Sequence, residues 1–292
     1  MRLFYTGLFY ALVPFLLLRL LIKGRKQPGY RQRIGERFGR YPGMKPLGSV
    51  RPLWIHAVSV GECEAVFPLV KRLLLLEGAP PILMTCTTPT GSQRIQDVLG
   101  AGVMHVYLPY DLPGAIQNFL THFKPQAGVV VETEIWPNLF KACEKKGIPL
   151  AIINGRLSLK SLKGYRRLGA LMQDILKAVT ILATQTQEDS DRYLQAGAAA
   201  KTLRVAGNIK FDIAYDEAMK EEAHQLRATL FKNRPVWIAG STHPGEEEVL
   251  FDALRLVRAQ YPDVVLVLAP RHPERAADIV TLATHHGENV VR

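Results

Sequence analysis

The stretch Leu53-Trp-Ile-His-Ala-Val-Ser-Val-Gly-Glu62 joins an apolar run to a tight turn and then to the start of a helical pattern. The run over residues 53–58 has the aromatic and β-branched residues typical of a buried strand. Ser59 and Gly61 close the turn, and Glu62 opens the following helix. A strand that passes within a few residues into a helix is the repeating unit of parallel α/β sheets. This stretch therefore predicts an α/β fold.

The same unit recurs along the chain. Short apolar runs alternate with helical patterns, which predicts a parallel sheet covered by helices on both faces. The expected strands are residues 53–58, 82–86, 104–107, 127–131, 150–153, 181–183 and 203–205. The expected helices are residues 65–76, 92–99, 114–123, 139–146, 165–179 and 188–196.

A second, shorter series follows, with strands expected at 236–239 and 264–269 and helices at 246–261 and 274–285. This is fewer units than a doubly wound domain has, so we expect residues 208–292 to form a second domain that is cut short. Residues 27–207 are expected to form the first domain. A polar stretch with Gly and Pro at 40–49 predicts a linker before its first strand.

The positive charge is concentrated at one end of the chain. The net charge is +11, and residues 1–50, with ten Lys or Arg and one Glu, carry +9 of it. Nucleic-acid binding would require a basic surface across the fold, so we do not expect it. Cys63, Cys86 and Cys143 lie far apart without metal-ligand spacing, which predicts neither a disulfide framework nor a zinc site.

The N-terminal segment is an apolar run followed by a collar of basic residues. Residues 3–22 are about as long as a bilayer-spanning helix, although Thr6, Pro14 and Arg19 interrupt them. No small-residue cleavage site follows, so we expect residues 1–26 to be an uncleaved anchor, either spanning or interfacial. The collar predicts that the rest of the chain faces the cytoplasm. The alternative is a buried hydrophobic helix with a solvated basic flank.

Carboxylates follow two of the expected strands. Ligands of open α/β sheets bind at the carboxyl ends of the strands, where Glu62 and the pair Glu132 and Glu134 are expected. A carboxylate at such an edge can take a proton from an alcohol. The alternative for each acid is a charge at the entry of a helix, which complements the helix dipole.

Small hydroxyls and cations follow other strands of the first domain. Thr88, Thr90 and Gly91 stand where a helix begins, with Arg94 in its first turn, and together they predict an anion or sugar-carboxylate site. The alternative is an ordinary helix cap. Arg156 and Lys210 place cations at strand ends, where a surface ion pair is the alternative.

Two loops of the second domain predict a phosphate site. The first carries Ser241, Thr242 and His243, and the second carries Arg271, His272 and Arg275. Hydroxyls at a helix start and a guanidinium can hold a phosphate. The two histidines lack metal-ligand spacing, and the motifs of dinucleotide-binding enzymes and P-loop kinases are absent from the sequence.

Taken together, these motifs resemble one known family, the 3-deoxy-D-manno-octulosonic acid (Kdo) transferases of lipopolysaccharide biosynthesis. The resemblance extends over nearly the whole chain and includes the basic segment from Gly24 to Arg37. It rests on His56-Ala-Val-Ser-Val-Gly-Glu62, Thr87-Thr-Pro-Thr-Gly-Ser-Gln-Arg94, Tyr107-Leu-Pro-Tyr-Asp-Leu-Pro113, Glu132-Thr-Glu-Ile-Trp-Pro-Asn138, Lys210-Phe-Asp212 and Pro270-Arg-His-Pro-Glu-Arg275.

The resemblance implies a GT-B glycosyltransferase with two Rossmann-like domains, located at the cytoplasmic side of the cell inner membrane. It implies transfer of Kdo with inversion, without a metal or other cofactor, from CMP-Kdo to a lipid A precursor, lipid IVA, with anionic membrane lipids as further partners. Glu62 resembles the catalytic base, and Glu132 or Glu134 the second essential carboxylate. Donor contacts are expected in the second domain at Ser241, Thr242, His243, Arg271, His272 and Arg275. Acceptor contacts are expected in the first domain at Ser59, Gly61, Thr88, Thr90, Gly91, Arg94, Arg156 and Lys210.

One departure from the family limits this expectation. Its members carry a further Gly-rich motif in the second domain, which this sequence lacks, so we expect an incomplete donor site. The alternatives are a GT-B transferase that uses a UDP-sugar and an inactive lipid-binding homologue.

Overall fold

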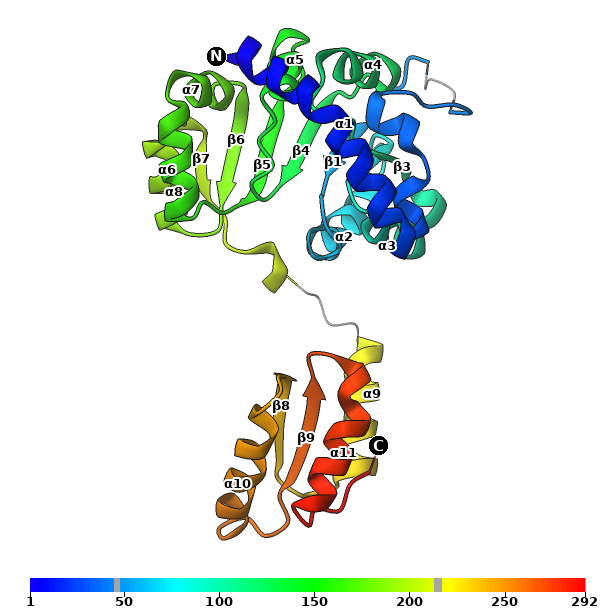
Figure 1. Ribbon diagram of the computed structural model, residues 1–292, viewed down its shortest axis with the longest axis vertical. Helices are drawn as coiled ribbons and strands as arrows, with labels where there is room; N and C mark the ends of the chain where they lie inside the picture. The colour runs from blue at the N-terminus through cyan, green and yellow to red at the C-terminus, as the bar shows by residue number, and fades with distance from the viewer. Residues whose placement is uncertain (45–47, 213–216, 292) are drawn as a thin grey trace. The chain divides into compact units, whose positions relative to one another are not determined.

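The computed structural model describes residues 1–44, 48–212 and 217–291. Residues 45–47 of the expected linker lie outside the described residues. The chain forms two compact units, Met1–Ala214 and Tyr215–Arg292, which we call unit 1 and unit 2 (Figure 1).

Unit 1 is built on a sheet of seven strands in the order β3-β2-β1-β4-β5-β6-β7, and every neighbouring pair is parallel. The strands are β1 (Leu53–His56), β2 (Ile82–Cys86), β3 (Met104–Tyr107), β4 (Ala127–Val131), β5 (Leu150–Gly155), β6 (Val179–Thr184) and β7 (Leu203–Val205). The expected parallel α/β sheet is thus confirmed, with each predicted strand present.

Side chains of successive strand residues point to opposite faces of this sheet, so the unit has two apolar cores. Trp54 of β1 belongs to one core with Phe119 and Phe140, and Ile55 belongs to the other with Val66. Helices cover both faces (Figure 1). They are α2 (Val60–Leu74), α3 (Pro89–Leu99), α4 (Pro113–Phe123), α5 (Pro137–Lys145), α6 (Leu159–Leu168), α7 (Ala170–Leu176) and α8 (Gln187–Gln195).

The helix predicted over residues 165–179 is wrong in its bounds. The structure has two helices here, α6 and α7, which meet at Gly169. Gly169 has φ +48°, a left-handed value that ends one helix before the next begins. The apolar period continues from α6 into α7, and the sequence pattern therefore concealed the break.

The N-terminal helix α1 (Arg2–Lys26) lies along unit 1 (Figure 1). Thr6 donates a hydrogen bond to Asn138 Oδ1 at 3.1 Å, and the ring of Phe9 meets that of Trp136 edge to face. Further along, Leu20 is buried. The opposite side of the helix, with Leu3, Phe4 and Phe15, is 68–85% exposed. One stripe of α1 therefore packs on the rest of unit 1, while a second apolar stripe is largely exposed to solvent.

Unit 2 is smaller and contains a parallel pair of strands, β8 (Val236–Thr242) and β9 (Val265–Pro270). Its helices are α9 (Glu217–Leu226), which continues into a π-helical turn, α10 (Glu246–Arg258) and α11 (Ala276–His285). Phe251, Ile279 and Ala283 form its core. The strand and helix series after residue 236 is as expected, but α9 was not predicted.

A buried carboxylate from another loop caps helix α5. Trp136 precedes this helix and has no side chain able to accept a hydrogen bond, and Asp111 takes over that role. Its carboxylate oxygens accept hydrogen bonds from the backbone N–H groups of Asn138 at 2.9 Å and Leu139 at 2.8 Å. The loop after β3 is thereby tied to the helix that follows the Glu132 and Glu134 loop.

We expect Asp111→Asn to lower the free energy of unfolding of unit 1 by about 1–3 kcal/mol. The amide nitrogen cannot accept one of these hydrogen bonds, so a buried N–H group is left without a partner. Urea denaturation followed by tryptophan fluorescence measures the change. Asp97→Asn is the matched control, because Asp97 is exposed. Equal stability of the two variants would contradict the capping role.

Candidate active site at the carboxyl edge of the first sheet

The strand order of unit 1 reverses between β1 and β4. The chain proceeds outward from β1 through β2 to β3 and then returns to pair β4 with β1. Such a reversal separates the loops that leave the two strands and opens a crevice at their carboxyl ends. Glu62 follows β1, and Glu132 and Glu134 follow β4. The topology therefore brings the expected carboxylates to one place.

Glu62 is held by the first turn of α2. Ser59 is the N-cap, and Glu62 stands three residues later, as in a capping box. The Glu62 carboxylate accepts hydrogen bonds from the Val58 backbone N–H at 2.6 Å and from the Ser59 hydroxyl at 3.1 Å. Burial nevertheless raises the pKa of Glu62, and the charge of Glu132 adds to this rise. The helix-entry contact thus fixes the orientation of a half-buried carboxylate beside other acids.

Glu132 has a different environment. Its φ is +62°, a left-handed value uncommon for a residue with a side chain, and its N–H donates to the carbonyl of Ile153 at 2.8 Å. The carboxylate forms an ion pair of 2.9 Å with Lys210. Lys210 therefore lies at the expected edge of the sheet, where it compensates the charge of Glu132.

Glu134 is the carboxylate whose proton affinity is most suited to chemistry near neutral pH. Burial raises its pKa from 4.5 to about 7, and the charges of Glu62 and Glu132 contribute to the rise. No salt bridge to Glu134 exists among the residues that the structure describes. A group with a pKa near the working pH is efficient in proton transfer.

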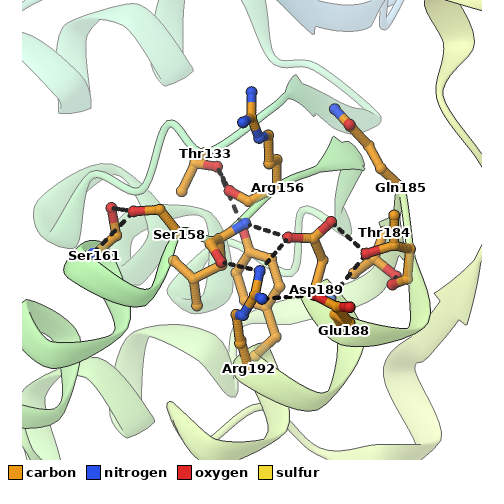
Figure 2. A network of polar contacts seen from close by, with 12 residues as sticks. Thr133, Arg156, Ser158, Ser161, Thr184, Gln185, Glu188, Asp189 and Arg192 are labelled. Atoms are coloured by element: carbon orange, nitrogen blue, oxygen red, sulfur yellow. Dashed lines mark hydrogen bonds and ion pairs between the residues drawn. The ribbon is translucent and has the colours of Figure 1, made fainter.

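The loop that carries the two acids is tethered through Thr133. The Thr133 hydroxyl donates to the backbone carbonyl of Arg156, and Tyr193 donates to the Thr133 hydroxyl at 3.4 Å. Figure 2 shows this tether beside a network around Asp189, which accepts from the Leu157 N–H at 2.9 Å. The loops after β4, β5 and β6 thus hold each other in place. The exposed Arg156 side chain points away from this network.

The polar residues of the loop after β2 have mainly local contacts. Thr88 caps α3 by accepting the N–H of Gly91 at 3.1 Å, and Arg94 pairs with Glu64 on the neighbouring helix. Thr90 and Gly61 are exposed, and Gly61 faces open space. Of this expected group, Thr88 lies in the wall of a cavity that Glu134 also lines.

This cavity has a volume of about 470 Å³ and lies between α1 and the carboxyl edge of the sheet. Its walls include apolar residues of α1, the basic residues Arg19, Lys23 and Arg37, and Trp136. The sequence predicted that the basic collar, which includes Lys23 and Arg37, suits the phosphates of the acceptor, whereas it gave Arg19 and Trp136 no role in a site. Their contribution depends on how α1 packs, which no local pattern indicates.

The expected donor residues gather at the carboxyl ends of β8 and β9. Ser241 and Arg271 are exposed, and the rings of His243 and His272 are 6.5 Å apart. Thr242 and Arg275 stabilise the loop itself. Buried Glu247 accepts hydrogen bonds from the Thr242 hydroxyl at 2.8 Å and from two Arg275 nitrogens at 3.0 Å each. Within the described ranges, no cluster of His, Cys, Asp or Glu is arranged to hold a metal ion.

Comparison with known proteins identifies the family. The family model described as 3-deoxy-D-manno-octulosonic-acid transferase (kdotransferase) matches residues 32–213, which include the three site carboxylates. The chain belongs to the Kdo transferase family. This finding confirms the resemblance that the motifs indicated.

Curated Kdo transferases align along most of this chain. The enzyme from Haemophilus influenzae is 38% identical over 94% of the chain, and that from Bordetella pertussis is 36% identical over 93%. A probable mitochondrial Kdo transferase of Arabidopsis thaliana is 33% identical over 98%. The chain covers 64% of the length of each of these relatives.

Solved structures support the fold of this Kdo transferase family member. UDP-GlcNAc 2-epimerase from Neisseria meningitidis superposes with a TM-score of 0.56 at 14% identity, covering 81% of this chain and 70% of that one. A glycosyltransferase from Rickettsia africae has a TM-score of 0.51 at 11% identity, covering 82% and 66%. These similarities confirm the expected GT-B class.

Proposed function

We propose that the protein transfers Kdo from CMP-Kdo to a lipid A precursor, with inversion at the anomeric carbon and without a metal. The observation that carries the proposal is the meeting of Glu62 and Glu134 at the reversal point of the sheet, in a chain of the Kdo transferase family. Residues 27–207 would bind the acceptor, and residues 208–292 would contribute to donor binding.

In the proposed step, the Glu62 carboxylate takes the proton of an acceptor hydroxyl. The hydroxyl oxygen forms a bond to the anomeric carbon of Kdo while the bond from that carbon to the CMP phosphate breaks. CMP leaves with the electron pair, and attack opposite the leaving group inverts the configuration. The ionised Glu134 carboxylate increases the proton affinity of Glu62, because two negative charges in a partly dry site repel each other.

The departing phosphate needs positive charge, which arginines supply without a metal. In unit 2, exposed Arg271 and Ser241 are suited to contact the nucleotide, with His243 and His272 beside them. Thr242 and Arg275 would hold the loop in place through Glu247. On the acceptor side, Ser59, Thr88 and Arg156 lie on loops at the carboxyl edge of the sheet.

A transfer assay tests the proposal. We expect a version of the protein extended by the family's Gly-rich donor segment to release CMP from CMP-Kdo when lipid IVA is present, and excess CMP to inhibit more strongly than excess UDP. Stronger inhibition by UDP would favour a UDP-sugar donor. Binding of lipid IVA without any CMP release would favour an inactive lipid-binding protein.

We further propose that α1 attaches the protein to the cytoplasmic side of the inner membrane. The helix is long and apolar enough to cross a bilayer, with a mean hydropathy of 1.8. Because one stripe packs on unit 1 and the other is exposed, the helix is better suited to lie in the interface with Phe4 and Phe15 toward the lipid. The basic residues at its end would bind anionic lipids.

Removal of residues 1–26 is expected to abolish vesicle binding at high salt and to leave unit 1 folded. The two apolar cores of unit 1 contain no residue of α1, so the domain does not depend on the helix for its interior. Sedimentation with phosphatidylglycerol vesicles at low and high salt measures the binding. The double variant Phe4→Ser/Phe15→Ser keeps the packed stripe and should lose part of the binding. A truncated protein that still sediments at high salt would contradict the anchor role.

A further inference from the structure

Arg37 is a buried cation without a counter-ion among the residues that the structure describes. It lies in a short 3-10 helix (Ile34–Phe38), is only 3% exposed, and stacks on the ring of Tyr107, with Cζ 4.1 Å from the ring centre. Its Nε and Nη2 have no hydrogen-bond partner among the described residues. An N–H of each points to the same edge of the planar guanidinium, which is the edge that grips an oxyanion with two hydrogen bonds.

The neighbouring carboxylate does not compensate this charge. Glu36 pairs with Arg33 at 2.7 Å through Oε1 and accepts the Tyr107 N–H at 2.8 Å through Oε2. Arg33 also donates to the Ser92 hydroxyl and to the carbonyl of His105. The two adjacent arginines therefore differ: Arg33 is fully engaged, and Arg37 is not. A buried charge is normally paired, so the edge of Arg37 that lacks a partner is suited to an anion.

Arg37 lines the 470 Å³ cavity beneath α1, together with Arg19 and Lys23 of that helix. The cavity also has two acids in its wall. Asp111 is occupied as the cap of α5, and the pKa of Glu134 is raised to about 7 by burial and by nearby acids. Three cations thus face two acids, one of which is partly protonated near neutral pH, and this balance favours an anionic ligand.

Another part of the cavity lining is apolar. Phe9, Leu12 and Leu16 of α1 form it, next to the three cations. A free inorganic anion would gain nothing from this surface, whereas a molecule with an acyl chain and an anionic head group would contact both. Cations and apolar side chains line the same cavity, and this combination selects the class of ligand.

We propose that this cavity binds the phosphate of a phosphorylated lipid, with Arg37 as its main hydrogen-bond donor and α1 as the contact surface for its acyl chain. The inference deepens the proposed function, because this lipid would be the acceptor and Glu134 lies in the same wall. Arg37 would then set the position of the head group relative to the carboxylates. α1 would have two roles, one toward the membrane and one toward the ligand.

Binding of short-chain amphiphiles tests the site without any transfer reaction. Octyl phosphate, octyl glucoside and inorganic phosphate are titrated at constant ionic strength, below the concentrations at which micelles form. Trp136 lines the cavity, so its fluorescence reports binding, and Trp136→Phe should remove the signal. We expect octyl phosphate to bind at least about tenfold more tightly than either of the other two probes.

Two variants separate a specific site from general electrostatic attraction. Arg37→Met should weaken octyl phosphate binding by about tenfold to a hundredfold, because hydrogen bonds between charged groups are lost. Arg72→Gln removes the same charge from an exposed position of α2 outside the cavity lining and should change binding less than about threefold. Equal losses in both variants would overturn the role of Arg37.

A purely structural role for Arg37 would give a different pattern. Replacing an unpaired buried charge by an apolar side chain of similar length should leave the melting temperature unchanged or raise it. A marked fall in the melting temperature of Arg37→Met, with octyl phosphate binding retained, would overturn the proposal. If the variant does not fold, the wild-type protein decides: octyl phosphate must raise its melting temperature more than octyl glucoside does. A protein that binds octyl phosphate through Arg37 but transfers no sugar would keep this site and lose the proposed function.

Discussion

Glu62→Gln, in a version of the protein extended by the family's Gly-rich donor segment, is expected to lower the rate of Kdo transfer by about 10²–10⁴-fold, the usual contribution of a general base. Glutamine keeps one oxygen that can accept the Val58 N–H, so the cap of α2 should persist. It cannot take a proton from the acceptor hydroxyl. The variant should therefore fold and bind CMP as the wild-type protein does, and the loss should appear in the rate of CMP release at saturating substrate.

The matched control for this prediction is Glu64→Gln. Glu64 lies on the same helix, is exposed, and pairs with Arg94 on the surface. Its replacement removes the same charge two residues away and should change the rate less than about threefold, as expected for a solvent-screened pair. Near-normal transfer by Glu62→Gln, or an equal loss in both variants, would remove Glu62 from the mechanism.

Glu134→Gln is expected to lower transfer by about 10²-fold and to change its pH dependence. In the wild-type protein the rate should rise as pH increases through about 7, where Glu134 loses its proton and strengthens Glu62 as a base. The variant has no such group, so its rate should stay low and show no inflection there. Measurement of the rate from pH 5.5 to 8.5 compares the two.

Glu132→Gln is the control for the pH profile. Glu132 is paired with Lys210, and its charge adds only the smallest contribution to the raised pKa of Glu134. This variant should keep an inflection, at a slightly lower pH. If Glu132→Gln abolishes the inflection and Glu134→Gln retains it, the second carboxylate is Glu132.

The pKa of Glu134 also predicts a stability effect that needs no substrate. Its folded-state pKa of about 7 lies above the unfolded value of 4.5, so the folded protein binds more protons between these values. Stability should therefore rise as pH falls from 7 toward 4.5. Glu134→Gln should stabilise the protein at pH 8 by about 2 kcal/mol, allowing for partial solvent screening, and much less at pH 5. Urea denaturation at the two pH values measures this difference.

Much of unit 1 was predictable because its determinants are local. The buried strands of a parallel sheet are continuous apolar runs, and each is followed by its own turn and helix, so β2, β3, β4 and β7 lie where their patterns indicated. The break at Gly169 was missed because the apolar period passes through it. Helix α9 was missed because its sequence is polar, with Met219 and Leu226 as its only large apolar residues.

The sequence by itself determined that Glu62 and the pair Glu132 and Glu134 would follow parallel strands, and hence share an edge of the sheet. Only the tertiary structure decided how the environments of the two acids of the pair differ. Lys210 neutralises Glu132, while burial and the charge of Glu62 raise the pKa of Glu134. The burial of a carboxylate and the charges around it depend on atoms from distant parts of the chain, so no pattern of neighbouring residues predicts them. For the same reason, no local pattern indicates that Arg37 lines one cavity with residues of α1, or that two of its nitrogens have no hydrogen-bond partner among the described residues.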